Sequence, residues 1–157
     1  MQTKFLIIGS SHAGLSAADE IRVHDQEGPL TMISMENCLP YSPTILPYII
    51  EGKVEEKNVY LRDEKSFRDK KITFLRGKKA VKVDTQAAKV LLDDGSEIAY
   101  EKLLVATGSE PTIPPVPGLK ESTHYVLRTM EDAHKINQAA QKAESAVVLG
   151  TGLVGMH

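Results

Sequence analysis

The sequence predicts an α/β fold: a Rossmann-like domain of three layers with a small antiparallel β-meander, followed by the start of a second Rossmann domain. Three observations carry this prediction. A glycine loop at residues 9–14 stands between an apolar run and an alanine-rich helical stretch. Short β-type runs fill residues 71–100, and a second glycine loop at residues 150–155 follows another apolar run.

The composition is that of a globular protein and excludes some classes of partner. The 157 residues are 41% hydrophobic, enough for one buried core and the beginning of a second. The net charge of -2 gives no global positive field, so neither nucleic acid nor an anionic membrane is an expected partner. The early apolar run Phe5–Ile8 is too short for a signal peptide or a membrane span, and we expect a cytoplasmic protein.

The first elements form a strand, helix and strand unit of the kind that builds a parallel sheet. The apolar pattern predicts a strand over Thr3–Ile8, a helix over Leu15–His24 and a second strand over Leu30–Ser34. Prolines then break the chain, and connecting helices are predicted at Ile45–Ile50 and Asp63–Asp69.

The remainder of the chain divides into the meander, a buried strand and a new unit. The meander is predicted from Ile72–Leu75, Lys79–Val83 and Lys89–Leu92, and the buried strand from Lys102–Ala106. A proline-rich linker closes at Gly118, which predicts one domain at residues 1–118 and the start of another at 119–157. In the second region the predicted elements are a strand at His124–Leu127, a helix at Met130–Lys142 and a strand at Ser145–Leu149.

The first glycine loop fits a dinucleotide-binding pattern with Ser11 in place of the middle glycine. Gly9 permits a tight turn, and Gly14 lets the helix pack close to the sheet. The helix N-terminus can then bind a pyrophosphate. Glu36 lies 22 residues beyond Gly14, where a carboxylate can accept hydrogen bonds from ribose hydroxyls. The alternative is an ordinary glycine turn with an incidental glutamate, and His12 is either near the pyrophosphate or simply solvated.

Ala106-Thr107-Gly108, followed by a proline-rich stretch and the loop at residues 150–155, makes the whole chain resemble the pyridine nucleotide-disulfide oxidoreductase superfamily. The resemblance implies FAD and NAD(P)H as cofactors. FAD would contact residues around the first loop, after the second strand, in the meander and at the Ala-Thr-Gly turn: Gly9, Ser11, His12, Ala13, Gly14, Glu36, Asn37, Val81, Ala106, Thr107 and Gly108. NAD(P)H would contact the second loop through Gly150, Gly152, Leu153, Val154 and Gly155.

The segment at residues 36–46 resembles the short-loop branch of that superfamily, which includes rubredoxin and ferredoxin reductases and the flavoprotein part of nitrite reductase. In that branch a pair matching Pro40 and Tyr41 runs beneath the flavin, and an arginine matching Arg128 reaches FAD. The branch's usual arginine two residues after the tyrosine is Pro43 here. Arg128 could equally be a solvated residue at a helix start. A finer likeness is to the FAD-containing NADH:acceptor subunits of bacterial multi-subunit 2-oxoacid or aldehyde oxidoreductases.

Cys38 is the single cysteine, so the chain lacks the dithiol of the disulfide reductases and has no internal disulfide. NADH oxidases and coenzyme A-disulfide reductases use one cysteine before a Leu-Pro-Tyr run, which is an alternative for Cys38. In those enzymes, however, a glycine follows the cysteine and the ribose glutamate lies about ten residues upstream. Here Glu36 is two residues away. We therefore expect Cys38 to be a small packing residue.

No catalytic side chain and no metal site is expected, because the reactive chemistry would belong to the cofactors. The resemblance implies hydride transfer from NAD(P)H to FAD and onward electron transfer to a small molecule, an electron-transfer protein or a partner subunit. The alternative is a truncated, non-catalytic flavin-binding module. On either view we expect the isolated 157 residues to be inactive, because little helix follows the second loop, and the apolar run around Val147 favours a homo-oligomer.

Overall fold

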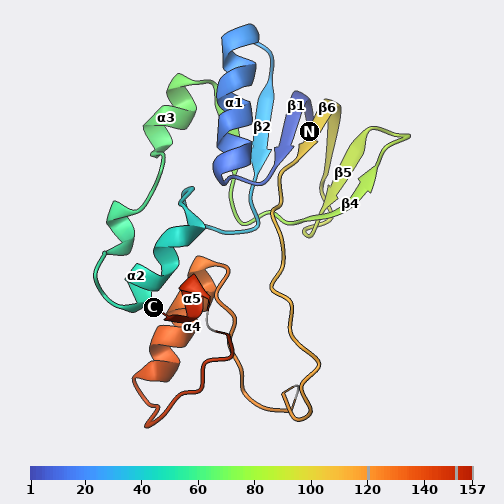
Figure 1. Ribbon diagram of the computed structural model, residues 1–157. Helices are drawn as coiled ribbons and strands as arrows, with labels where there is room; N and C mark the ends of the chain where they lie inside the picture. The colour runs from blue at the N-terminus through green and yellow to red at the C-terminus, as the bar shows by residue number, and fades with distance from the viewer. Residues whose placement is uncertain (120, 151, 157) are drawn as a thin grey trace. The chain divides into compact units, whose positions relative to one another are not determined.

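The computed structural model describes residues 1–119, 121–150 and 152–156. The chain forms two compact units, each built from two stretches of sequence (Figure 1). The first unit is Met1–Tyr41 with Tyr60–Gly108, and the second is Ser42–Val59 with Ser109–His157. The predicted boundary at Gly118 remains a prediction.

The first unit is organised around parallel strands that pair in the order β3-β2-β1-β6. The last three residues of β1 are apolar and buried. A central parallel strand is covered on both faces and therefore requires such an apolar run. A crossover through α1 carries the chain from β1 to the parallel strand β2. The bounds are β1 Gln2–Ile8, α1 His12–His24, β2 Leu30–Ile33, α3 Glu64–Asp69, β3 Ile72–Leu75 and β6 Glu97–Val105.

Two antiparallel strands extend this sheet to six strands, ordered β3-β2-β1-β6-β5-β4. They are β4 Ala80–Asp84 and β5 Lys89–Leu92, which confirms the predicted meander. The prediction that Ile72–Leu75 belongs to the meander is wrong, because α3 returns the chain to run parallel beside β2. The separate strand predicted at Lys102–Ala106 is the second half of β6, whose first half already pairs with β5.

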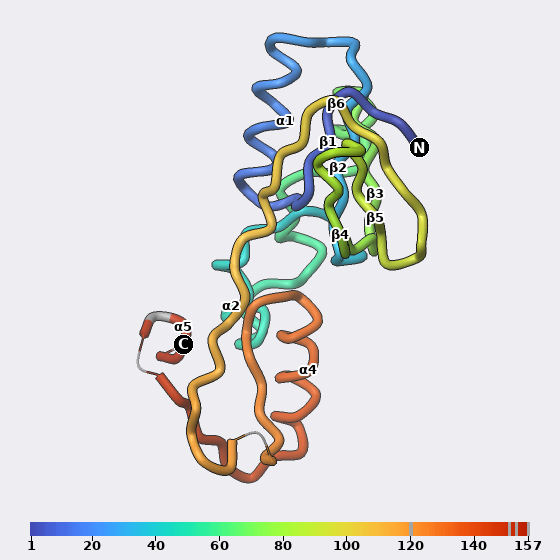
Figure 2. The backbone as a smooth tube through the Cα atoms, turned by 90° about the vertical axis from the view of Figure 1, so that its right-hand side faces the viewer, coloured from blue at the N-terminus to red at the C-terminus, as the bar shows by residue number. Residues whose placement is uncertain are grey.

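The apolar side chains of the first unit form two clusters on opposite faces of β1. Ile7 belongs to one, with Leu15 and Ala18 of α1 and Phe67 of α3. Successive residues of a strand point to opposite faces, so Leu6 and Ile8 belong to the other cluster, with Val90 and Leu92 of β5 and Ile98 of β6. Helices, parallel strands and meander therefore make the predicted three layers, and Figure 2 shows α1 standing to one side of the strands.

The regular elements described in the second unit are all helices. The helix α4 begins after Thr129, whose hydroxyl accepts from the amide of Asp132 while the Asp132 carboxylate accepts from the amide of Thr129. This reciprocal cap satisfies two amides that have no partner inside the helix. Met130 and Ala133 of α4 are buried, and α4 packs against α2. The bounds are η1 Pro43–Ile45, α2 Leu46–Ile50, η2 Glu56–Asn58, α4 Met130–Ala140 and α5 Leu153–Met156.

Two strand predictions in the second unit are wrong. Residues 124–127 and 145–149 both have extended character in the sequence, yet neither forms a strand in the described part of the chain. Local β-propensity is insufficient without a partner strand that supplies hydrogen bonds and a face to pack against. Val147 is 97% exposed, which shows that nothing described here covers it.

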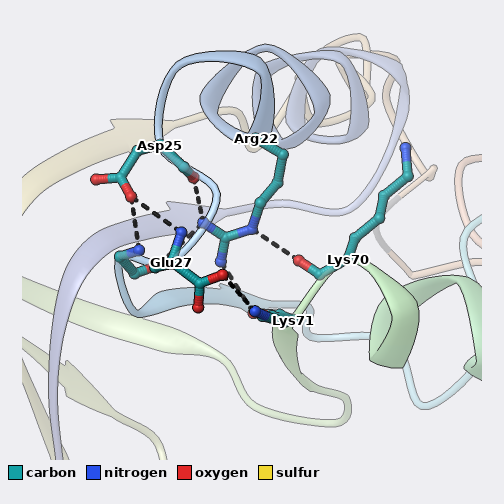
Figure 3. A network of polar contacts seen from close by, with 6 residues as sticks. Arg22, Asp25, Glu27, Lys70 and Lys71 are labelled. Carbon is teal, nitrogen blue, oxygen red and sulfur yellow. Dashed lines mark hydrogen bonds and ion pairs between the residues drawn. The ribbon is translucent and has the colours of Figure 1, made fainter.

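A polar network fixes the end of α1 to the turn before β3 (Figure 3). The Arg22 guanidinium donates to four backbone carbonyls, of Asp25 at 2.8 Å, Gly28 at 3.0 Å, Lys70 at 2.7 Å and Lys71 at 2.9 Å. Lys71 has a left-handed φ of 53°. Arginine suits this position because its planar fork presents several donors in a fixed geometry.

Asp25, in the same network, gives the unit a predicted pH dependence. The Asp25 carboxylate accepts from Lys4 Nζ at 2.6 Å and from the Gly28 amide at 2.6 Å. These bonds, the Lys4 bond above all, lower the pKa of Asp25 to about 2. A lowered pKa stabilises the fold above the unfolded value of about 3.9 and ceases to do so as the pH falls toward the folded value. Urea unfolding across this pH range should therefore show a steeper loss of stability for the native protein than for Asp25→Asn. Equal slopes would contradict this expectation.

Among the described residues, no helix combines the length and the apolar character needed to cross a membrane. The same residues include no group of three or more histidine, cysteine, aspartate or glutamate side chains that could hold a metal ion.

Candidate functional site

The carboxyl ends of the parallel strands meet at one edge of the first unit. The Gly9 amide donates to the Ile33 carbonyl at 2.9 Å, and the Ala106 amide donates to the Ile8 carbonyl at 2.8 Å. These two bonds show that β1, β2 and β6 end side by side, so the residues that follow the three strands begin close together. From β1 the chain continues to β2, which pairs with one edge of β1, whereas β6 pairs with the opposite edge of β1. Ligands of open parallel sheets bind in the crevice at such a switch point.

The first glycine loop needs both of its glycines. Gly9 has a φ of +112°, and a Cβ there would lie 2.1 Å from the carbonyl oxygen of Ala106. At Gly14 a Cβ would lie 2.0 Å from the carbonyl oxygen of Gly9. Because both obstacles are backbone atoms, side-chain rotation cannot relieve either clash. The backbone therefore makes the tight turn and the close helix approach expected from the sequence.

The helix α1 begins at His12, three residues before the predicted Leu15, so the end of the glycine loop is already its first turn. The Ser11 side chain makes no capping bond to the described first-turn amides, and the first turn contains no acidic residue. His12 and Ala13 are exposed. The first amides of any helix lack partners inside it and carry the positive end of its dipole. This 13-residue helix therefore offers an anion its exposed amide end.

Glu36 follows β2 and is held along its backbone. Its amide donates to the Ser34 hydroxyl at 3.2 Å, and its carbonyl accepts from the Gly77 amide at 3.1 Å. Its side chain is half-buried and accepts a hydrogen bond from the Tyr41 hydroxyl at 2.7 Å. Sequence reasoning missed Ser34 and Gly77, although a glycine between two β-type runs was a visible signal for the second.

The other residues predicted to line the site have different surroundings. Pro40 and Tyr41 are buried, and the Leu61 amide donates to the Pro40 carbonyl at 2.7 Å. Asn37 is exposed beside Gly77, and Val81 on β4 is 52% exposed. After β6 the chain turns through Ala106, then through the exposed residues Thr107 and Gly108, the latter with a φ of +72°.

Arg128 belongs to the second unit, where it lies just before α4. It donates from Nε to the carbonyl of Ser109 at 2.8 Å, and its amide donates to the Asp132 carboxylate at 3.1 Å. Arg128 is thus bonded to the residue that follows Gly108 in the chain, and its predicted contact with FAD stays a prediction.

The second glycine loop repeats the geometry of the first. Gly150 has a φ of +120°, and a Cβ at Gly155 would lie 2.3 Å from the carbonyl oxygen of Gly150. The short helix α5 follows, with Val154 exposed, while the Leu153 side chain lies outside the described part of the structure. The difference lies in the surroundings: a Cβ at Gly150 would meet no described atom within 4 Å.

Comparison with known proteins identifies relatives that match nearly the whole chain. The NADH-dependent phenylglyoxylate dehydrogenase subunit epsilon of Aromatoleum evansii is 49% identical over 99% of this chain and 37% of its own length. Rhodocoxin reductase of Rhodococcus erythropolis is 33% identical over 96% of this chain and 36% of its own length. The chain thus spans well under half the length of these relatives.

A solved structure, the NADH:rubredoxin oxidoreductase from Clostridium acetobutylicum, matches 99% of this chain and 40% of its own length, with a TM-score of 0.89 and 29% identity. The family model described as pyridine nucleotide-disulphide oxidoreductase matches residues 3–157, which include the first loop, the Ala-Thr-Gly turn and the second loop. The chain therefore belongs to the pyridine nucleotide-disulphide oxidoreductase family.

Proposed function

We propose that this chain is the FAD-binding part of an NAD(P)H:acceptor oxidoreductase. The observation that carries the proposal is the first glycine loop, which opens an uncapped helix, together with a positioned carboxylate at the end of β2. Family membership supports it, because two of the relatives bear the names of NADH-dependent or reductase proteins. The whole protein's activity is part of the proposal, since the chain covers 37% of the first relative.

The residues present fit FAD. The close turn at Gly9 and Gly14 leaves room for a pyrophosphate at the amide end of α1, beside Ser11, His12 and Ala13. Glu36 can accept from the adenosine ribose. We assign the adenine side to Asn37 and the backbone of Val81, and the remaining flavin contacts to Pro40, Tyr41, Ala106, Thr107, Gly108 and Arg128.

When bound, FAD would supply the capacity to accept a hydride and release electrons one or two at a time. The chain's own share is to bind and orient. The α1 dipole and amides would offset the pyrophosphate charge, and the residues at the carboxyl ends of the strands would orient the ligand. No general acid or base is required of this chain.

We assign NAD(P)H to the second loop, through Gly150, Gly152, Leu153, Val154 and Gly155. Support comes from the close approach of Gly155 to Gly150, which matches that of Gly14 to Gly9. The electron acceptor would be a redox protein or a partner subunit. That choice rests on the names of the relatives, which include a rhodocoxin reductase and a dehydrogenase subunit.

Anaerobic titration with NADH and with NADPH tests the proposed function, in a purified flavoprotein that contains this chain and extends to the length of its relatives. We expect one of the two nucleotides to bleach the flavin absorbance stoichiometrically, and an added one-electron acceptor to restore it. A flavin that dithionite reduces but neither nucleotide reduces would refute the oxidoreductase proposal and favour a non-catalytic flavin-binding module.

A separate prediction concerns Cys38, which is half-buried and lies two residues after Glu36. We expect Cys38→Ser to change NADH-driven reduction of an artificial acceptor by less than about twofold, because a small packing residue tolerates an isosteric exchange. Steady-state turnover at matched flavin content checks this, in a protein that extends to the length of the relatives. A collapse of turnover in a variant that keeps its flavin would instead support a cysteine-dependent mechanism of the NADH oxidase type.

A further inference from the structure

The hydroxyl of Tyr41 has a specific partner, the carboxylate of Glu36. The distance from the phenolic oxygen to Glu36 Oε2 is 2.7 Å, and the tyrosine side chain is almost completely buried, at 5% exposure. A tyrosine at this depth generally places its hydroxyl against a hydrogen-bond partner, since a buried unpaired hydroxyl is costly. Here the partner is the side chain assigned to the ribose.

The backbone around Tyr41 is fixed independently of Glu36. Tyr41 forms an antiparallel bridge with Tyr60, and the Leu61 amide donates to the Pro40 carbonyl at 2.7 Å. Pro40 and Pro43 flank the tyrosine and restrict the local backbone further. The phenol is therefore attached to a segment that is anchored to a distant part of the first unit.

The backbone of Glu36 is fixed as well, from both of its sides. Ser34 accepts from its amide at 3.2 Å, and Gly77 donates to its carbonyl at 3.1 Å. The freedom that remains is in the side-chain torsions, and a long carboxylate side chain loses substantial entropy when it is ordered. A hydrogen bond to its terminal oxygen removes that freedom before any ligand binds.

We infer that Tyr41 is a positioning residue for FAD: its hydroxyl holds the Glu36 carboxylate in the orientation that receives the adenosine ribose. This inference rests on the proposed function. It gives Tyr41 a role on the adenosine side of the ligand, in addition to the contact beneath the flavin that family resemblance implies. Preorganising a binding group raises affinity by reducing the entropy lost on binding.

A double-mutant cycle on the purified apoprotein tests the inference, with Tyr41→Phe, Glu36→Ala and the pair, and with the FAD dissociation constant as the readout. Tyr41→Phe keeps the buried ring and removes only the hydroxyl. We expect it to weaken FAD binding roughly five- to twentyfold when Glu36 is present. In the Glu36→Ala background the same change should cost less than about twofold, since the hydroxyl then has no carboxylate to hold.

Tyr125→Phe is the matched control, because it removes the same hydroxyl from a tyrosine that is 49% exposed. It should leave FAD binding unchanged. Thermal unfolding of each apoprotein separates a loss of folding from a loss of affinity. An equal penalty for Tyr41→Phe in both backgrounds, or no penalty in either, overturns the inference while leaving the proposed function intact. If Glu36→Ala alone binds FAD as tightly as the native protein, the assigned ribose site itself is wrong.

Discussion

Gly9→Ala is expected to destabilise the first unit by about 3 kcal/mol or more and to abolish FAD binding. The added Cβ would lie 2.1 Å from the carbonyl oxygen of Ala106, and the φ of +112° is unfavourable for any residue with a side chain. Relief requires separation of the end of β1 from the end of β6. That separation would displace the glycine loop, and with it the start of α1, from the end of β6. Urea unfolding and FAD titration measure the two effects.

Gly95→Ala provides the matched control for this prediction. Gly95 has a φ of +81°, but a Cβ there would meet no described atom within 4 Å. The control therefore carries backbone strain without a collision, and we expect a cost of about 1 kcal/mol with FAD binding retained. Equal costs for the two substitutions would show that conformational strain alone explains the requirement for Gly9.

Ala13→Glu is expected to stabilise the apoprotein and to weaken FAD binding at the same time. Ala13 is exposed in the first turn of α1, which has no acidic residue. A carboxylate there interacts favourably with the helix dipole, which should add about 0.3 to 1 kcal/mol of stability. The same carboxylate repels a bound pyrophosphate, and a repulsion of about 2 kcal/mol or more corresponds to at least roughly thirtyfold weaker binding.

The neutral variant Ala13→Gln separates charge from size. It should bind FAD within about threefold of the native protein, because it has the shape of glutamate without the charge. Apoprotein unfolding and FAD titration at low ionic strength give both quantities. If Ala13→Glu and Ala13→Gln weaken FAD equally, steric obstruction explains the loss and the anion need not lie at this helix end.

The local parts of the fold were predictable from the sequence. The apolar run before Gly9 and the small residues around Gly14 specify a strand, a tight turn and a helix within a short stretch, so sequence spacing alone located them. The partner and direction of β3 were not predictable. The run Ile72–Leu75 suits a parallel or an antiparallel strand equally, and the decision depends on how α3 brings the chain back to β2.

Long-range contacts also account for what sequence reasoning missed at the site. The bond between Tyr41 and Glu36 depends on the bridge from Tyr41 to Tyr60, which joins segments with no shared pattern in the sequence. Similarly, the exposed run at Val147 has the composition of a strand, but strand formation requires a neighbour that pairs with it. The pattern of residues indicates which local structure a segment favours, whereas these features arise from contacts between segments that are distant in the sequence.

Identification of the flavin released from the purified protein tests the central claim most directly. The amide end of α1 and the carboxylate of Glu36 are placed to hold the pyrophosphate and the adenosine ribose, and FMN has neither an adenosine ribose nor a pyrophosphate. Denaturation followed by chromatography against FAD and FMN standards should therefore yield FAD. Release of FMN, or of a nicotinamide dinucleotide with no flavin, would contradict the assignment of the first glycine loop.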